Sequence, residues 1–431
     1  MNIQDLYKIY QQFPSIQTDT RKLKAGDLFF ALKGGNFNGN QFAQQAIDLG
    51  AAYCIVDESV TTNRPDKILR VEDVLNTLQE LAGYHRRQFS IPFIAITGSN
   101  GKTTTKELIH AVLSSSFMTY TTEGNLNNHI GIPLTLLKIK ADAQLAVIEM
   151  GANHLKEIAG YCEYAQPTHG LITNCGKAHL EGFGSVEGVR KGKGELYDYL
   201  RAHDGTAFVM WDYEYLRNMS QGIPHLLTYG TANAQLLGAA EKSSSFLKVK
   251  INGGNELNEI GTQLVGDYNL PNVLAAISVG QYFKVPDEKI KSSLERYTPS
   301  NSRSQLIEQG TNKIILDAYN ANPSSMKAAI ENFAHIPGEN KILILGAMAE
   351  LGEESLKEHQ SIIDLINQHR WKDVILVGGD FVKLNAAFRT FENSLQAKEW
   401  YQQQSLRNSN LLIKGSRSMQ MEKLLDSPPS H

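Results

Sequence analysis

A glycine turn at residues 97–107 carries the clearest chemical signal, Thr-Gly-Ser-Asn-Gly-Lys-Thr-Thr-Thr-Lys-Glu. An apolar run precedes it at 93–96, and a helical apolar pattern follows it from residue 108. A turn from a strand into a helix directs backbone N–H groups and the positive end of the helix dipole at one point, where a triphosphate can bind. Lys102 adds a mobile cation and Thr103 a hydroxyl for magnesium. The residues expected to contact the phosphates of ATP or GTP are Gly98, Ser99, Asn100, Gly101, Lys102, Thr103 and Thr104.

The turn departs from the general P-loop pattern, in which a glycine stands five positions before Gly101. This chain has Ile96 there, so Gly98 is the first glycine of a shortened loop. The alternative is an ordinary glycine turn before a helix. Lys102 and Thr103 in register after a buried strand favour the nucleotide site.

Two further groups are expected at the same edge of the sheet as this turn. The apolar run 145–148 delivers Glu149 at the end of a strand, and the strand at 171–174 leads into the segment that carries His179. The carboxyl ends of parallel strands share one edge, so a carboxylate there could hold magnesium beside Thr103. The alternatives are a solvated loop glutamate and a structural or exposed histidine.

The composition describes an ordinary folded chain. A length of 431 residues suggests two to four domains, and we expect three. The 42 Lys+Arg and 45 Asp+Glu nearly balance, and no basic run alternates with aromatic residues, so we expect no nucleic-acid partner. The start of the chain lacks a secretory pattern and no apolar stretch approaches about 20 residues, so we expect a cytoplasmic protein without a transmembrane segment.

The three cysteines, Cys54, Cys162 and Cys175, are too widely spaced for a disulfide framework or a Cys-x-x-Cys metal site. We expect buried thiols in a reducing compartment.

Alternating apolar strands and helical patterns predict an α/β fold in three domains. Residues 1–88 form a small α/β N-terminal domain, 89–298 a central P-loop domain with a mostly parallel sheet, and 299–431 a doubly wound, Rossmann-like C-terminal domain. A turn-rich linker at 298–302 separates the last two. The predicted strands are 27–32 and 52–56, then 93–96, 145–148, 171–173 and 208–210 with peripheral strands within 239–264, then 313–316, 341–345, 374–377 and 411–413. The predicted helices include 42–49, 71–84 and 272–282.

Several segments in the predicted central and C-terminal domains resemble the Mur ligases, a family of amide-forming ligases. They are residues 97–107, 124–137, 149–154, 178–188, 193–195, 317–326 and 351–353. Within the family, Tyr-Asn-Ala-Asn-Pro at 319–323 is similar to the member that joins D-alanyl-D-alanine to UDP-MurNAc-tripeptide.

The resemblance implies roles for the groups at the sheet edge. Lys102 and Thr103 would contact the ATP phosphates and a first magnesium ion, which Glu149 also holds, while His179 and Lys193 would serve a second metal. In the family the lysine matching Lys193 is carbamylated, and a carbamate anion suits a site for two Mg²⁺ ions better than an ammonium does. From the sequence alone, we would expect Lys193 to be a surface lysine in a Lys-rich turn.

The resemblance also implies contacts with the nucleotide base and sugar. Asn272 matches the adenine contact, Asp317 the ribose contact, and Arg303 reaches the nucleotide from the linker. Without the resemblance, Asn272 would be a helix N-cap and Asp317 a strand-end residue.

The N-terminal segment around Thr20, Arg21 and Lys33 resembles the strip that receives the UDP moiety, and two basic side chains suit a diphosphate. The remaining substrate contacts implied by the resemblance are Asn125, Asn128, Asn320 and Asn322.

The chain departs from the family pattern in two places. Tyr268 stands where the family has His, and Gly-Ala-Met at 346–348 stands where it has Gly-Asp-Met. Residues 414–417, Lys-Gly-Ser-Arg, match a family segment near the closed active site.

The resemblance therefore implies an ATP- and Mg²⁺-dependent ligase that forms UDP-MurNAc-pentapeptide through an acyl phosphate, and we expect a monomer. The alternatives are a sister ligase that adds the third amino acid, a folylpolyglutamate synthetase, or a non-catalytic nucleotide switch. Glu149, His179 and Lys193 together argue against the switch, which needs no second metal site.

Overall fold

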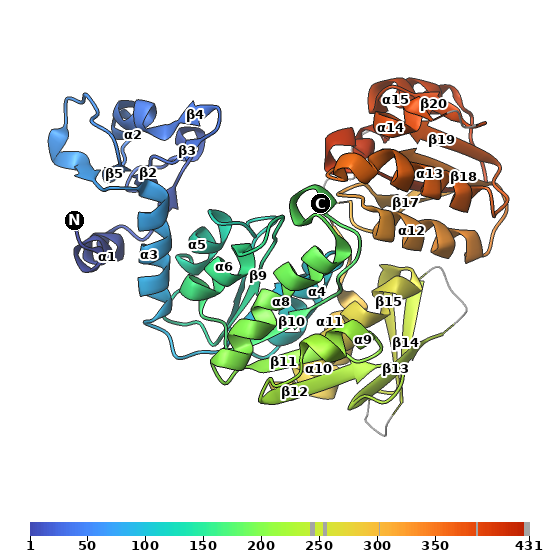
Figure 1. The fold of residues 1–431 in the computed structure, drawn as a ribbon, viewed down its shortest axis with the longest axis horizontal. Helices are drawn as coiled ribbons and strands as arrows, with labels where there is room; N and C mark the ends of the chain where they lie inside the picture. The colour runs from blue at the N-terminus through green and yellow to red at the C-terminus, as the bar shows by residue number, and fades with distance from the viewer. Residues whose placement is uncertain (242–245, 253–256, 301, 385–386, 426–431) are drawn as a thin grey trace.

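The computed structural model describes residues 1–431 except 242–245, 253–256, 301, 385–386 and 426–431. The chain forms three α/β domains, and Figure 1 shows the N-terminal domain (blue) and the C-terminal domain (red) on opposite sides of the central one. The predicted three-domain α/β fold is confirmed. Asn301 of the predicted linker lies outside the described residues.

The N-terminal domain contains a four-stranded parallel sheet in the order β1-β2-β5-β6. Alternate residues of its strands face opposite sides: Phe29 and Cys54 pack toward α2, while Phe30 and Ile55 join the core shared with the central domain. The elements are α1 (Ile3–Gln12), β1 (Ile16–Gln17), β2 (Leu28–Phe30), the hairpin β3 (Lys33–Gly34) and β4 (Phe37–Asn38), α2 (Ala43–Asp48), β5 (Tyr53–Val56), β6 (Ile68–Arg70) and α3 (Val74–Arg86).

Helix α3 joins the first domain to the second. It begins at Val74, three residues later than predicted, because the Asp73 carboxylate accepts the N–H of Asn76 at 2.7 Å and caps the helix. Near its end, His85 Nε2 lies 2.8 Å from the Ile139 carbonyl oxygen. The helix thus leads from the N-terminal domain onto the side of the central one (Figure 1).

The central domain is built on a nine-stranded sheet in the order β15-β14-β13-β12-β11-β10-β7-β9-β8. Strands β8 to β13 pair in parallel, and β14 and β15 add antiparallel pairs at one edge. The strands are β7 (Phe93–Thr97), β8 (Thr119–Thr121), β9 (Leu145–Glu149), β10 (His169–Ile172), β11 (Thr206–Met210), β12 (His225–Gly230), β13 (Leu236–Ala240), β14 (Phe246–Asn252) and β15 (Glu259–Val265).

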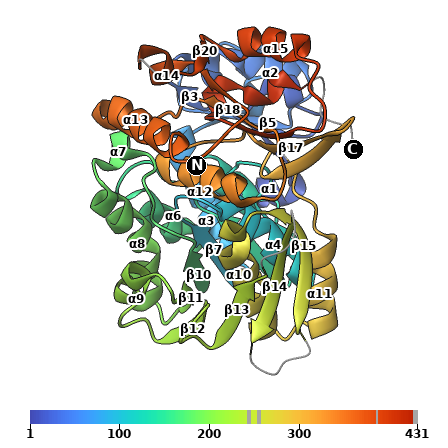
Figure 2. The same cartoon turned by 90° about the vertical axis from the view of Figure 1, so that its right-hand side faces the viewer.

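Helices cover both faces of the central sheet. Figure 2 shows α6, α8 and α9 on one side and α4, α10 and α11 on the other. The helices are α4 (Lys102–Ser114), α5 (Gly131–Leu136), α6 (Glu157–Ala165), α7 (Leu180–Phe183), α8 (Val186–Ala202), α9 (Glu214–Met219), α10 (Leu270–Tyr282) and α11 (Asp287–Arg296). The crossovers bring the ends of β7, β9 and β10 to one edge of the sheet.

The C-terminal domain is a six-stranded sheet in the order β16-β17-β21-β18-β19-β20, with only β16 antiparallel. Successive side chains along its strands point to opposite faces of the sheet. Leu343 and Leu345, for example, face one core, and Ile342 and Ile344 face the other. The elements are β16 (Gln305–Gln309), β17 (Asn312–Asp317), α12 (Pro323–His335), β18 (Lys341–Gly346), α13 (Ser355–Ile366), β19 (Asp373–Val377), α14 (Gly379–Lys383), β20 (Arg389–Phe391), α15 (Ser394–Gln403) and β21 (Asn410–Lys414).

Among the described residues, no helix is both long and apolar enough to cross a membrane. All three cysteines are free and buried.

Candidate active site

A cavity of about 710 Å³ lies where the central domain meets the C-terminal domain. Most of the predicted site residues line it: Ser99, Asn100, Gly101, Lys102, Thr103, Thr104, Asn125, Asn128, Glu149, His179, Asn272, Arg303, Asp317, Asn320 and Asn322. Residues more than 200 positions apart in the chain therefore face one space.

The nucleotide loop has the backbone shape that its glycines allow. Gly98 and Gly101 have φ values of +145° and +80°, in the region that favours glycine. A Cβ on Gly98 would also collide with the Thr173 hydroxyl at the end of β10. The neighbouring Asn174 accepts the N–H of Ser99 at 2.8 Å and the N–H of Asn100 at 3.1 Å. The shape of the loop is thus fixed by a strand that is distant in sequence.

Lys102 begins α4 and folds back over the loop. Its Nζ donates to the Gly98 carbonyl oxygen at 2.7 Å. Burial lowers the pKa of Lys102, and the negative charge of Glu149 partly opposes that shift. The ammonium lies beside the loop that is expected to hold the phosphates. A bound phosphate oxygen could therefore replace the Gly98 carbonyl oxygen as the acceptor of its hydrogen bond.

Glu149 ends β9 and is only 1% exposed. Its Oε1 accepts from Asn127 Nδ2 at 2.7 Å, whereas its Oε2 is buried without a hydrogen-bond partner among the described residues. An unpartnered buried carboxylate oxygen is costly unless a cation meets it. The contact of Asn127 was missed, because the motif at 124–137 contains several asparagines and does not show which one turns inward.

Lys193 is not the surface lysine that the sequence alone suggests. It lies in α8, is 0% exposed, and donates from Nζ to the Ala152 carbonyl oxygen at 2.8 Å. Burial, reinforced by the positive charge of Lys102, lowers its pKa to about 7. Lys193 does not line the cavity, although Ala152 does.

His179 faces the C-terminal domain. It adopts a left-handed backbone conformation with φ +52° before α7, and its Nδ1 lies 2.5 Å from Glu350 Oε2. Among the described residues, no three His, Cys, Asp or Glu side chains form a group that could hold a metal ion. The predicted metal set contains only two such residues, Glu149 and His179.

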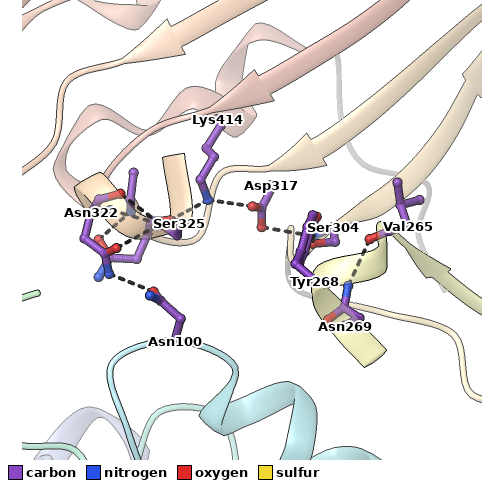
Figure 3. Close-up of polar contacts among 11 residues, drawn as sticks. Asn100, Val265, Tyr268, Asn269, Ser304, Asp317, Asn322, Ser325 and Lys414 are labelled. Atoms are coloured by element: carbon purple, nitrogen blue, oxygen red, sulfur yellow. Dashed lines mark hydrogen bonds and ion pairs between the residues drawn. The ribbon is translucent and has the colours of Figure 1, made fainter. Parts of the chain in front are cut away.

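The C-terminal wall of the cavity is a connected set of polar contacts (Figure 3). Lys414 is 2% exposed, and its Nζ lies 2.5 Å from Asp317 Oδ2 and 3.2 Å from the Asn320 carbonyl oxygen. The other carboxylate oxygen of Asp317 accepts the N–H of Ser304 at 3.1 Å. The Ser304 hydroxyl lies 3.0 Å from the Tyr268 hydroxyl, so this wall is tied to the central domain.

Arg303 stacks its guanidinium 3.6 Å from the centre of the Tyr319 ring. This cation–π contact holds the predicted nucleotide-binding arginine against the wall of the cavity.

Asn272 is not the N-cap of α10, because Asn269 occupies that position. Instead, Asn272 lies inside the first turn, where its Oδ1 accepts from Thr105 at 3.0 Å and its Nδ2 donates to Asn269 at 2.9 Å. It thus links α10 to the helix that follows the nucleotide loop.

The asparagines predicted to contact substrate have local partners as well. Asn128 Oδ1 accepts the N–H groups of Ile130 and Gly131 in the turn before α5. Asn322 caps α12 through the N–H of Ser325. Asn125 and Asn320 also line the cavity.

The predicted UDP strip lies away from these residues, in the N-terminal domain. Arg21 pairs with Asp19 at 2.8 Å, and Lys33 lies 3.0 Å from both Asp57 and Glu58. Neither these side chains nor Thr20 line the cavity.

The sequence and the fold both have close relatives. Residues 12–86 match the Mur ligase family catalytic domain, 96–280 the Mur ligase middle domain, and 302–417 the Mur ligase glutamate ligase domain. The chain is 35% identical over 433 residues to the UDP-N-acetylmuramoyl-tripeptide--D-alanyl-D-alanine ligase of Bacillus subtilis, an alignment that covers 96% of this chain and 94% of the relative.

Two solved structures extend the similarity to three dimensions. The crystal structure of MurF from Acinetobacter baumannii superposes with a TM-score of 0.87 at 29% identity, covering 98% of this chain and 97% of that one. MurF ligase from Thermotoga maritima in complex with ADP gives a TM-score of 0.85 at 25% identity, covering 95% and 96%. Because three Mur ligase family models together match most of the chain and a relative at 35% identity aligns with 96% of it, this protein belongs to the Mur ligase family.

Proposed function

We propose that this protein is the ATP-dependent ligase that joins D-alanyl-D-alanine to UDP-MurNAc-tripeptide. The observation that carries the proposal is the full-length similarity to ligases of that name. The structure adds that the nucleotide loop and the segment 319–323 face one cavity, where a phosphate donor and an acceptor could meet.

The reaction proceeds in two steps. A terminal carboxylate oxygen of the tripeptide attacks the γ-phosphorus of ATP, the bond to the bridging oxygen breaks, and ADP leaves. The amine nitrogen of the dipeptide then attacks the acyl phosphate carbonyl, a proton leaves the nitrogen, and inorganic phosphate departs. Positioning and charge stabilisation supply most of the rate enhancement in phosphoryl transfer.

The residues of this chain would act mainly on the phosphates. Backbone N–H groups of the loop and the start of α4 would hold the β- and γ-phosphates, while Lys102 would exchange the Gly98 carbonyl for a phosphate oxygen. Asp317 and Arg303 would bind the nucleoside end from the opposite wall.

A magnesium ion fits this site. The unpartnered Oε2 of Glu149 is an anionic oxygen without a cation, and Thr103 supplies a hydroxyl nearby on the cavity wall. When bound, magnesium would neutralise charge on the phosphate oxygens.

We also propose that Lys193 is carbamylated. The unprotonated amine attacks CO2, and a pKa of about 7 leaves much of this lysine unprotonated at neutral pH. A nitrogen–carbon bond forms and one proton leaves the nitrogen, so the neutral amine becomes a carbamate anion. Starting from the ammonium form, two protons are released in total. Protein exchanged into ¹³C-bicarbonate should show a carbamate carbon signal by NMR, and Lys193→Ala should lack it; a signal in neither protein would contradict the proposal.

We propose separate tasks for the domains: residues 1–88 bind the UDP moiety, 89–298 bind ATP, and 299–431 bind the acceptor and complete the nucleotide site. We place the protein in the cytoplasm, where ATP and UDP-linked precursors are found.

Mass spectrometry of two reactions tests the substrate. With ATP, magnesium, UDP-MurNAc-tripeptide and D-alanyl-D-alanine, we expect the pentapeptide product; with UDP-MurNAc-dipeptide and free lysine or diaminopimelate, we expect none. A product only in the second mixture would assign a sister activity. ATP turnover should need both substrates, and rapid hydrolysis without either would favour the nucleotide switch.

A further inference from the structure

One partly buried hydrogen bond joins the nucleotide loop directly to the acceptor segment. Asn322 Nδ2 donates to Asn100 Oδ1 at 2.7 Å, across the boundary between the central and C-terminal domains (Figure 3). Asn322 is only 8% exposed. Water therefore competes weakly for this bond.

On the C-terminal side, the amide of Asn322 is held by its own helix. Its Oδ1 accepts the N–H of Ser325 at 2.9 Å, and the Ser325 hydroxyl accepts the N–H of Asn322 at 3.1 Å, which completes a capping box. Because Oδ1 is committed to the helix, the Nδ2 group is presented to the central domain.

On the central side, Asn100 is fixed by the end of β10. Its carbonyl oxygen accepts from the Thr173 hydroxyl at 2.6 Å and from Asn174 Nδ2 at 3.1 Å. The hydrogen bond thus connects two rigid elements, the tip of the nucleotide loop and the first turn of α12.

Other residues of the C-terminal wall are linked to Asn322 and would move with it. Lys414 ties the carboxylate of Asp317 to the backbone of Asn320, two residues before Asn322. A displacement of the α12 start would therefore be transmitted to both the acceptor segment and the nucleoside end of the cavity.

We propose that Asn322 is a positioning residue for the transfer step, which places the acceptor segment against the phosphate end of the nucleotide by bonding to Asn100. This role rests on the proposed function and is distinct from any contact that Asn322 makes with the acceptor itself. The bond would help to hold the reacting groups of the loop and the segment in register, together with the hydrogen bond from the Lys177 N–H to Ser324 Oγ at 2.9 Å.

Asn322→Ser tests the proposal, because serine still caps α12 but is too short to reach Asn100. The matched control is Asn393→Ser, the N-cap of α15, which has no contact with the central domain among its hydrogen bonds. We expect kcat to fall about tenfold in Asn322→Ser, the loss of roughly one hydrogen bond, with ADP affinity and melting temperature as in the control. Equal kinetics in the two variants would mean that the residue only caps its helix.

A double-mutant cycle with Asn100→Ala separates positioning from direct substrate contact. If Asn322 acts through Asn100, the double variant should be no slower than the slower single variant. Losses that multiply would overturn the proposal.

A second readout does not depend on which substrate is ligated. Dyes placed through Met118→Cys and Leu395→Cys, at residues that are 52% and 59% exposed, would report the approach of the two domains, since the three native thiols are buried. With a non-hydrolysable ATP analogue, Asn322→Ser should shift the energy transfer toward separated domains. An unchanged signal contradicts the proposal, whereas a shift in a protein that does not ligate D-alanyl-D-alanine contradicts only the proposed function.

Discussion

The basic side chains expected at the two ligand sites differ in exposure and in partners: those of the N-terminal domain are exposed, and those of the central domain are buried or partly buried. Arg21 and Lys33 are exposed by 87% and 45% of their side-chain area and pair with adjacent carboxylates. Lys193 is 0% exposed and donates a hydrogen bond to a carbonyl oxygen, and Lys102 donates one to its own loop.

The two groups differ in the free energy needed to replace the partner of the basic side chain. Exposed ion pairs contribute little and are screened by salt, so Arg21 can exchange Asp19, and Lys33 can exchange the exposed Glu58, for a diphosphate at small cost. A buried lysine has no water to replace its partner, so its protonation and its chemistry are set by the fold. Substitutions should therefore act strongly in the central domain and weakly in the N-terminal one.

Lys193→Ala should have the largest effect. We expect at least about a hundredfold loss of ligation, because the proposed carbamate would serve a metal-assisted step, with ADP binding by calorimetry retained. Lys191→Ala, two residues earlier on the exposed face of α8, is the control and should stay active. Added small carboxylates should restore part of the activity. Full activity in Lys193→Ala would remove this residue from the mechanism.

Gly98→Ala should come next, since its Cβ would collide with Thr173 and its φ of +145° disfavours a side chain. We expect ADP affinity to fall by about ten- to a hundredfold, measured by calorimetry, because the loop must deform. Gly160→Ala, at an interior position of α6 with open space around it, should bind ADP normally and be slightly more stable. Normal binding by Gly98→Ala would show that the loop adapts freely.

Mild acid should destabilise the central domain through a buried histidine. Burial lowers the pKa of His169 to about 4 from an ordinary 6.5, so the unfolded chain binds more protons between these values, and stability is lost as the pH falls through this window. The loss is at most about 3 kcal/mol. In the N-terminal domain, the hydrogen bond from Arg21 lowers the pKa of Asp19 to about 2, so that pair survives until lower pH.

Calorimetric melting at pH 7 and pH 4.5 measures the loss of stability over this pH window. His169→Gln, which does not titrate, should lose less stability than the unsubstituted protein over the same interval. The same loss in both proteins would assign the acid sensitivity to other groups.

Arg21→Ala and Lys33→Ala should have the smallest effect. We expect the KM for the UDP-linked substrate to rise roughly three- to tenfold at low salt, with kcat unchanged and the difference shrinking as salt is added. A fall in kcat comparable to that of Lys193→Ala would show that these side chains contribute to the chemical step and do not only bind the UDP-linked substrate weakly.

The strands and the nucleotide loop were predictable from the sequence because their signals are local. Apolar runs such as 93–96 and 341–345 became β7 and β18, and the glycines at 98 and 101 carry the positive φ values that a tight turn needs. Short strands such as β1 and β6 were missed, since two or three residues carry no period.

The sequence by itself determined the fold class, the turn before α4, and which residue types could bind phosphate and metal, because these depend on neighbours within a few positions. Only the tertiary structure decided that Lys193 is buried, that Asn127 rather than another asparagine meets Glu149, and that Asn100 bonds Asn322. Burial and partnership are set by segments that are distant along the chain, and they in turn set the pKa of Lys193 and leave one oxygen of Glu149 without a partner.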